Sequence, residues 1–341
     1  MALGSALLFG ATTPIAKLLT GTIQPVLLAG LFYLGSGTGL ALWILLARRL
    51  VPVAAEAPLR RHDLPWLLLA ISSGGVIAPV LLMLGLASTA ASTASLLLNL
   101  EGVSTALIAW LVFKENYGTR VILGMAAITT GGIVLMFSGD TLSLSYGALL
   151  IIAACLCWSA DNNLTRKISA ADPAQIACIK GMVAGSVNAG LGLSIAKAIA
   201  DPGQILLAAL VGFFGYGISL VLFVLSLRYI GAARTGAYFS AAPFVGAALS
   251  IALLREPLTG QVLLAGTLMA VGLWLHLTER HEHEHWHEAM EHEHLHVHDE
   301  HHQHEHTATD PPGQPHSHLH KHAPMWHKHP HYPDIHHRHE H

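Results

Sequence analysis

About ten apolar runs, each long enough to cross a lipid bilayer, constrain this chain more than any other feature. A membrane-spanning helix needs ~20 apolar residues. Runs of this kind cover residues 1–19, 25–47, 64–88, 91–113, 120–138, 146–167, 174–196, 204–227, 231–254 and 260–277. In lipid every backbone polar group must be paired within its own segment, so these runs fold as helices. We predict an all-α membrane protein, because 52% hydrophobic and 11% charged residues are too apolar for a water-soluble domain.

One apolar run occurs twice. Residues 91–115 and 232–256 align without a gap, and each ends in a base followed by glutamate, Lys114-Glu115 and Arg255-Glu256. Phe9-Gly10-Ala11 matches Trp158-Ser159-Ala160 in the same way. We therefore predict two five-helix repeats, followed by a tail; the boundaries are 1–138, 145–278 and 279–341. In carriers of this plan the substrate site lies near mid-membrane between the repeats.

The basic residues predict the orientation. Most of them follow the even-numbered spans, at Arg48, Arg49, Arg60, Arg61, Lys114, Arg120, Arg166, Lys167, Arg228 and Arg234. Cytoplasmic loops are enriched in Lys and Arg, so both termini are predicted to be cytoplasmic in a bacterial inner membrane. An odd number of spans in each half then makes the two repeats inverted.

These residues resemble the drug/metabolite transporter superfamily, specifically its EamA-type ten-helix permeases. The resemblance rests on NLEGVSTALIAWLVFKE from Asn99, FGATTPIAK from Phe9, and the glycine-containing helices around Gly124 and Gly266, and it covers residues 1–278. It implies export from the cytoplasm by a carrier driven by an ion gradient. That family moves amino acids, other metabolites and drugs, and some members are linked to nickel and cobalt resistance. We do not expect an enzyme, because no nucleophile–base pattern or phosphate loop is present. We also expect no nucleic-acid partner.

Four polar residues inside the spans are the candidate transport and coupling residues: Glu101, Asn99, Asp161 and Lys180. Glu101 lies near the middle of its span, where an ionised carboxylate costs at least ~2.5 to 3.5 kcal/mol. We expect it to exchange a proton; the alternative is a neutral glutamate hydrogen-bonded in a packed interface. The aligned position in the second copy is Ala242, so only one repeat carries this acid.

Asp161 and Lys180 are predicted near the cytoplasmic ends of the sixth and seventh spans, where they can form a salt bridge or shape the inward mouth. Glu115 and Glu256 are expected to cap or anchor helix ends beside their basic neighbours. Aromatic residues within the spans can line a cavity or anchor the membrane interface, and these are Tyr33, Trp110, Trp158, Tyr216 and Tyr238.

The tail differs from the rest of the chain, because 23 of the 25 histidines lie from residue 281 onward. Its low complexity predicts disorder. Imidazole binds Ni, Co, Zn and Cu, so the tail is predicted to bind a divalent transition metal, whereas the transporter itself requires no cofactor. The candidate metal ligands are His281, His283, His285, His287, His292, His294, His296, His298, His301, His302, His304, His306, His316, His318, His320 and His322. A pH-responsive brush and a passive metal store beside an unrelated carrier are alternatives.

The tail and the metal-linked branch of the family together predict a proton-coupled exporter of nickel or cobalt that works by alternating access. The alternative is an exporter of a small metabolite or amino acid with a metal-binding regulatory tail. A membrane protein that senses or stores metal without transport is a third reading. The expected partners are the lipid bilayer, the transported solute or metal ion, and protons. The sequence is compatible with both a monomer and a homodimer.

Overall fold

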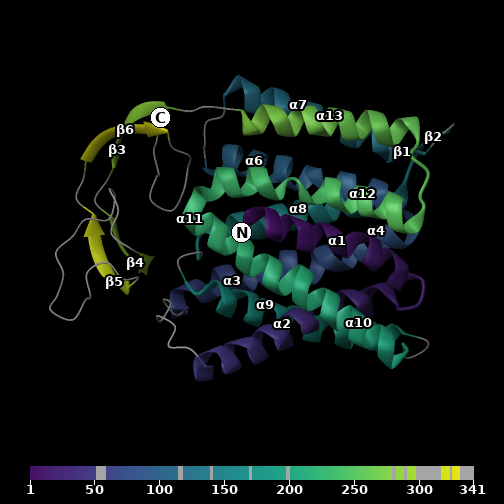
Figure 1. Ribbon diagram of the computed structural model, residues 1–341, viewed down its shortest axis with the longest axis horizontal. Coiled ribbons are helices and arrows are strands. Elements are labelled where there is room, and N and C mark those ends of the chain that lie inside the picture. Colours follow the sequence, from purple (N-terminus) through teal and green to yellow (C-terminus); the bar gives the residue numbers. More distant parts are fainter. Residues whose placement is uncertain are drawn as a thin grey trace.

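The computed structural model describes residues 1–50, 59–113, 118–138, 141–168, 171–196 and 200–278, and four tail segments, 282–287, 290–296, 316–322 and 325–330. Helices make up the membrane part (Figure 1). The first half contains α1 (Ala2–Thr20), α2 (Pro25–Leu50), α3 (Leu64–Ala70), α4 (Ala78–Ser88), α5 (Ala91–Leu97), α6 (Asn99–Phe113) and α7 (Thr119–Met136). The second half contains α8 (Tyr146–Arg166), α9 (Pro173–Ile195), α10 (Pro202–Gly212), α11 (Ser219–Phe239), α12 (Ala242–Leu254) and α13 (Gly260–Leu277).

Three short helical segments join some of these helices. A 3-10 turn, η1 (Arg61–Asp63), precedes α3. Two π-helical segments, η2 (Ile71–Ile77) and η3 (Phe213–Ile218), connect α3 to α4 and α10 to α11. Within the described residues, nine helical stretches are long and apolar enough to cross a membrane, and Ala242–Leu254 is a shorter apolar helix. The predicted all-α membrane fold is therefore confirmed.

Helix starts in the second half are capped by short polar side chains. Asp172 Oδ1 accepts hydrogen bonds from the backbone N–H groups of Ala174 and Gln175 at 2.8 and 3.3 Å, and Pro173 occupies the first position of α9. Asp201 caps α10 in the same way. Such caps pair N–H groups that a helix leaves unsatisfied at its first turn.

The ninth span differs from its prediction. We expected a loop before residue 231, but α11 continues from Ser219 to Phe239. The corresponding turn of the first repeat is present, because α4 ends at Ser88 and the next two residues, Thr89 and Ala90, are extended. Residues 228–239 contain no proline to interrupt a helix.

Helices that occupy the same position in the two repeats pack against each other at the two edges of the bundle (Figure 1). The pair α2–α9 lies along one edge and the pair α7–α13 along the other. A Cβ added at Gly181 would lie 2.5 Å from Gly37 N, and one added at Gly272 would lie 2.6 Å from Gly124 O. Both pairs therefore depend on direct approach of two helix backbones.

Between these edges, α8 packs on α4 and α6, whereas α1 packs on α11 and α12. The sixth span thus contacts the third and fourth, and the first span contacts the ninth and the end of the eighth. The first and sixth spans are equivalent in the two repeats, and each contacts the spans of the other repeat that correspond to the third and fourth. The centre of the bundle is consequently an interface between repeats.

Strands occur outside the bundle. β1 (Phe137–Ser138) and β2 (Thr141–Leu144) pair antiparallel between the two halves. The tail was predicted to be disordered; its described segments form β3 (Glu282–His287), β4 (Met290–His296), β5 (His316–His322) and β6 (Met325–Pro330). β3 pairs with β6 and β4 with β5, both antiparallel. Alternation of histidine with other residues has the period of two that suits a strand.

Candidate functional site

Two kinds of helix irregularity occur at matching places in the two repeats. The third and eighth spans contain the π-helical segments η2 and η3. The fourth span is interrupted at Leu98 and the ninth at Ser240 and Ala241. In the ungapped alignment of the duplicated run, Leu98 pairs with Phe239, so the two interruptions are adjacent in register. Discontinuous helices between repeats are typical of substrate and ion sites in secondary transporters, and π-segments are frequent at functional sites.

Side chains satisfy the carbonyl groups beside the interruption of the fourth span. Asn99 Nδ2 donates to Leu96 O at 3.0 Å, and Cys155 Sγ lies 3.6 Å from Leu97 O. Asn99 is buried, with 6% exposure. Asn99, a predicted transport residue, therefore serves in this conformation as the local cap at the end of α5.

A row of three side chains on α8 follows α5 and α6 across this interruption. Cys155, Ser159 and Asn163 are four residues apart, and they contact backbone carbonyls that are also four apart. These contacts are Cys155 Sγ to Leu97 O at 3.6 Å, Ser159 Oγ to Glu101 O at 2.9 Å and Asn163 Nδ2 to Thr105 O at 3.3 Å. Residues four apart lie on one helix face, so one face of α8 holds the backbone around Glu101.

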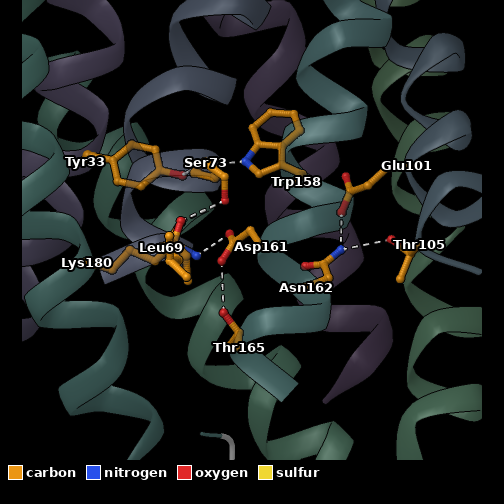
Figure 2. Close-up of polar contacts among 12 residues, drawn as sticks. Tyr33, Leu69, Ser73, Glu101, Thr105, Trp158, Asp161, Asn162, Thr165 and Lys180 are labelled. Atoms are coloured by element: carbon orange, nitrogen blue, oxygen red, sulfur yellow. Dashed lines mark hydrogen bonds and ion pairs between the residues drawn. The ribbon is translucent and has the colours of Figure 1, made fainter. Parts of the chain in front are cut away.

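The Glu101 side chain is also held by the opposite repeat. Asn162 Nδ2 donates to Glu101 Oε1 at 2.8 Å and lies 3.5 Å from Thr105 Oγ1 (Figure 2). Glu101 and Asn162 are both partly exposed. The second carboxylate oxygen of Glu101 accepts no hydrogen bond from the described part of the chain. One oxygen of this carboxylate is therefore held by Asn162, and the other offers a position for a proton.

Asp161 and Lys180 form the ion pair that the sequence suggested (Figure 2). Both residues are buried, with exposures of 4% and 5%. Thr165 Oγ1 donates to Asp161 Oδ1 at 2.9 Å. Each charge neutralises the other, so the pair joins α8 to α9 and gives this buried region no net charge.

The π-helical segment η2 lies directly beside this pair. A Cβ added at Gly74 would lie 2.0 Å from Asp161 Oδ2. The Gly74 carbonyl accepts hydrogen bonds from Tyr33 OH at 2.8 Å and from Trp158 Nε1 at 3.0 Å. Asn188 Nδ2 lies 3.2 Å from the carbonyls of the next two residues. Side chains of α2, α8 and α9 therefore satisfy backbone groups of η2.

Aromatic rings fill the centre between the repeats. Phe9 contacts Trp158, Tyr216 and Phe239 with ring centroids 6.2, 5.6 and 5.5 Å away, and Tyr33 lies 5.3 Å from Tyr216. We call these five residues the central aromatic cluster.

Two of the aromatic residues that the sequence singled out lie elsewhere. Trp110 and Tyr238 are exposed at 42% and 45%, which suits a membrane-facing position. Tyr33, Trp158 and Tyr216 are instead buried in the central aromatic cluster. Whether these three residues line a cavity stays a prediction.

No group of three or more His, Cys, Asp or Glu side chains that could hold a metal occurs among the residues searched, which are those the structure describes. In the tail, backbone register pairs His292 with His320 and His294 with His318. The candidates in described tail strands are His283, His285, His287, His292, His294, His296, His316, His318, His320 and His322. His281, His298, His301, His302, His304 and His306 lie outside the described residues. Metal binding by the tail stays a prediction.

Some residues of the site were missed from sequence. Ser159 was noted only as part of the repeat, and its spacing of four from Cys155 and Asn163 was the available signal. Glu256 caps a helix end as expected, but the helix is α5, because its two carboxylate oxygens accept from Ala91 N and Ser92 N. Glu115 lies outside the described residues. Long-range contacts of this kind leave no local pattern.

Comparisons with known proteins agree with this architecture. Residues 1–137 and 145–278 match the model of the EamA-like transporter family. An uncharacterized transporter of Methanothermobacter thermautotrophicus is 29% identical over 80% of this chain and 83% of its own length. The uncharacterized transporter YyaM of Bacillus subtilis is 25% identical over 74% of this chain and 84% of its own length. A solved crystal structure superposes with a TM-score of 0.62 at 19% identity, covering 81% of this chain and 97% of that one, which shows similarity of fold.

Proposed function

This chain belongs to the EamA-like transporter family, and on that premise we propose that it exports its substrate from the cytoplasm by alternating access, coupled to proton exchange at Glu101. It is a multi-pass membrane transporter of the drug/metabolite transporter superfamily, a non-enzymatic permease. The direction of transport, the coupling ion and the substrate are parts of the proposal.

The observation that carries the coupling is the hydrogen bond from Asn162 to Glu101. Hydrogen bonds to ionised groups are stronger than those between neutral groups. An ionised Glu101 therefore holds α6 against α8, and a protonated Glu101 holds it less tightly. Because α6 and α8 belong to different repeats, proton uptake would loosen an interface that must change during alternating access.

Asp161 and Lys180 have a supporting part in this proposal. Their ion pair is buried and internally neutral. It fixes α9 to α8 beside η2, and thereby positions the helix that carries Asn162. Proton exchange is left to Glu101.

The tail supports a divalent transition metal, nickel or cobalt, as the substrate. Its histidines would collect the ion on the cytoplasmic side before transport. The described helices contain no three-ligand group, so the ion would cross hydrated or complexed with a small molecule. This substrate rests on the tail, and the proposal requires that the tail feed transport.

The central aromatic cluster favours a second candidate, a small organic solute such as a metabolite or amino acid. Phe9, Trp158, Tyr216 and Phe239 come from four different segments that meet between the repeats. Aromatic rings are common where apolar parts of ligands bind. In this case the tail would bind metal in a regulatory or buffering role.

The test is transport in vesicles of known orientation, with and without an imposed proton gradient. Radiolabelled nickel is supplied first, with cobalt and zinc as competitors, and then amino acids in counterflow. Proton-driven movement that Glu101→Gln abolishes supports the coupling; Asp201→Asn, at the exposed cap of α10, is the matched control and should transport normally. Unchanged coupling in Glu101→Gln would contradict the proposal. Movement of an organic solute but not nickel would select the second substrate.

A further inference from the structure

Lys17 contacts the turn between the third and fourth spans. Its Nζ donates to Leu86 O at 2.7 Å and to Thr89 O at 2.8 Å. These carbonyls lie at the end of α4, where a helix leaves carbonyl groups unpaired and favours a positive charge. The side chain of α1 therefore caps the end of α4.

Glu256 contacts the other side of the same turn from the second repeat. Its Oε1 accepts from Ala91 N at 2.7 Å, and its Oε2 accepts from Ser92 N at 2.8 Å. These N–H groups begin α5, where a helix favours a negative charge. The opposite charges of Lys17 and Glu256 also attract each other. One turn is thus held by a base from its own repeat and by an acid from the other repeat.

The backbone before Glu256 has an unusual conformation. Arg255 ends α12 with φ 53 and ψ 36, and it is the non-glycine residue with positive φ in the part of the chain that the structure describes. Its side chain is exposed. L-residues adopt this left-handed conformation only where the surrounding structure holds it. The turn at Arg255 directs the chain so that Glu256 reaches α5.

The helices below this turn pack closely. Ser95 is fully buried, and a Cβ added at Gly246 would lie 2.7 Å from Ser95 Oγ and 2.9 Å from Gly10 O. α1, α5 and α12 therefore meet around Ser95. Ser95 cannot be reached from this end unless α5 and α12 separate.

We infer that Lys17 and Glu256 form a gate that holds this end of the bundle closed, with Glu256 as the polar link that breaks when α12 separates from α5. In this opening, Lys17 keeps its hydrogen bonds to the carbonyls at the end of α4. Glu256 moves away with α12 and leaves the first N–H groups of α5 to water, which can hydrate them. The orientation predicted from the basic residues makes this the extracytoplasmic gate. The inference rests on alternating access, but not on the substrate or on coupling through Glu101.

Thiol labelling tests the gate without any substrate. Ser95→Cys is introduced into full-length protein carrying Cys155→Ser, Cys157→Ser and Cys178→Ser, and intact cells are treated with a membrane-impermeant thiol reagent. Glu256→Gln removes the charge and one of the two acceptors. We expect labelling about tenfold faster, since tenfold corresponds to ~1.4 kcal/mol and one hydrogen bond to a charged group is of at least this size. Lys17→Met should also accelerate labelling.

The matched control is Gln261→Ala. Gln261 Nε2 donates to Val134 O at 2.6 Å, a contact that joins α13 to α7. Its loss should leave labelling of residue 95 unchanged. Unaltered labelling in Glu256→Gln, or equal acceleration in Gln261→Ala, would overturn the inference. Labelling needs neither a proton gradient nor a substrate, so failure of proton coupling in the vesicle assay and failure of the gate in the labelling assay give different results.

Cross-linking provides a second test. Glu256→Cys with Ser92→Cys, joined by a short bifunctional methanethiosulfonate reagent in the cysteine-free background, should stop transport until a reductant is added. Gln261→Cys with Val134→Cys, joined in the same way, should leave transport intact, because α7 and α13 pack as one pair. Full transport with residues 92 and 256 joined would overturn the inference.

Discussion

Asn162 on α8 donates a 2.8 Å hydrogen bond to Glu101 on α6, so an amide of one repeat holds the mid-span carboxylate of the other. Replacement of the amide by an apolar side chain of similar size, Asn162→Leu, should reduce proton-driven transport about 10- to 100-fold, since a hydrogen bond to a charged group contributes ~1.5 to 3 kcal/mol. Counterflow at equal pH should be retained. Thr165→Val, which removes a donor to Asp161 on the same helix, is the control for coupling. Loss of counterflow and driven transport to the same extent would contradict a role in coupling.

The Asp161–Lys180 ion pair should matter for stability. Lys180→Met leaves Asp161 as an unpaired buried charge and should lower the free energy of unfolding by ~3 to 5 kcal/mol. The double variant Asp161→Asn with Lys180→Met removes both charges and should recover most of that loss. Thermal unfolding of the purified protein in detergent measures both. A double variant as unstable as the sum of the two single variants would argue against the pair.

Gly74 should tolerate no side chain. A Cβ at this position would lie 2.0 Å from Asp161 Oδ2, so Gly74→Ala must displace η2 or break the ion pair. We expect a destabilisation of ~1 to 3 kcal/mol, typical of overpacking. Gly190→Ala is the control, because a Cβ there meets nothing within 4 Å. Equal melting temperatures for the two variants would show that η2 can move away from α8.

The row of polar side chains on α8 gives another stability prediction. Ser159→Ala removes a hydroxyl that lies 2.9 Å from Glu101 O and 2.7 Å from Cys155 O of its own helix, and it should cost about 1 kcal/mol, the typical net value of one hydrogen bond. Ser194→Ala, which removes an exposed hydroxyl bonded to its own helix, should have a smaller effect. The melting temperatures of the two variants, measured by thermal unfolding, compare the two effects. A larger loss for Ser194→Ala would mean that the row on α8 is not a support of α6.

Removal of the tail should separate metal binding from folding. Truncation before His281 should abolish nickel binding in equilibrium dialysis. The melting temperature without metal should stay unchanged, because the described tail strands pair with one another, β3 with β6 and β4 with β5. Replacement of the histidines of β4 and β5 by asparagine in the full chain is the finer variant. Undiminished nickel binding after truncation would place the metal site in the helices.

The helical type of the fold and most of its spans could be predicted from sequence, because a run of apolar residues has few other folds open to it in a membrane, whereas the boundary between the eighth and ninth spans could not. The ion pair of Asp161 and Lys180 was also accessible, since two opposite charges inside apolar spans need partners. The π-segments and the interruption at Leu98 were not, because backbone irregularity depends on donors such as Trp158 and Cys155 that approach from other helices. The partner of Glu256 lies 165 positions earlier in the chain, and helix periodicity carries no information about such a contact.

Glu101 has no equivalent acid in the second repeat, because Ala242 occupies the aligned position in the other copy of the duplicated run. Under the proposed coupling, one carboxylate carries one proton inward for each substrate molecule carried outward. Export of a divalent cation would then move one net positive charge out of the cell, against an inside-negative membrane potential that opposes it by ~2.3 kcal/mol per 100 mV. Export of a neutral or zwitterionic solute would be accelerated by the same voltage. The asymmetry between the repeats therefore makes the sign of the transport current a direct report of the charge on the cargo.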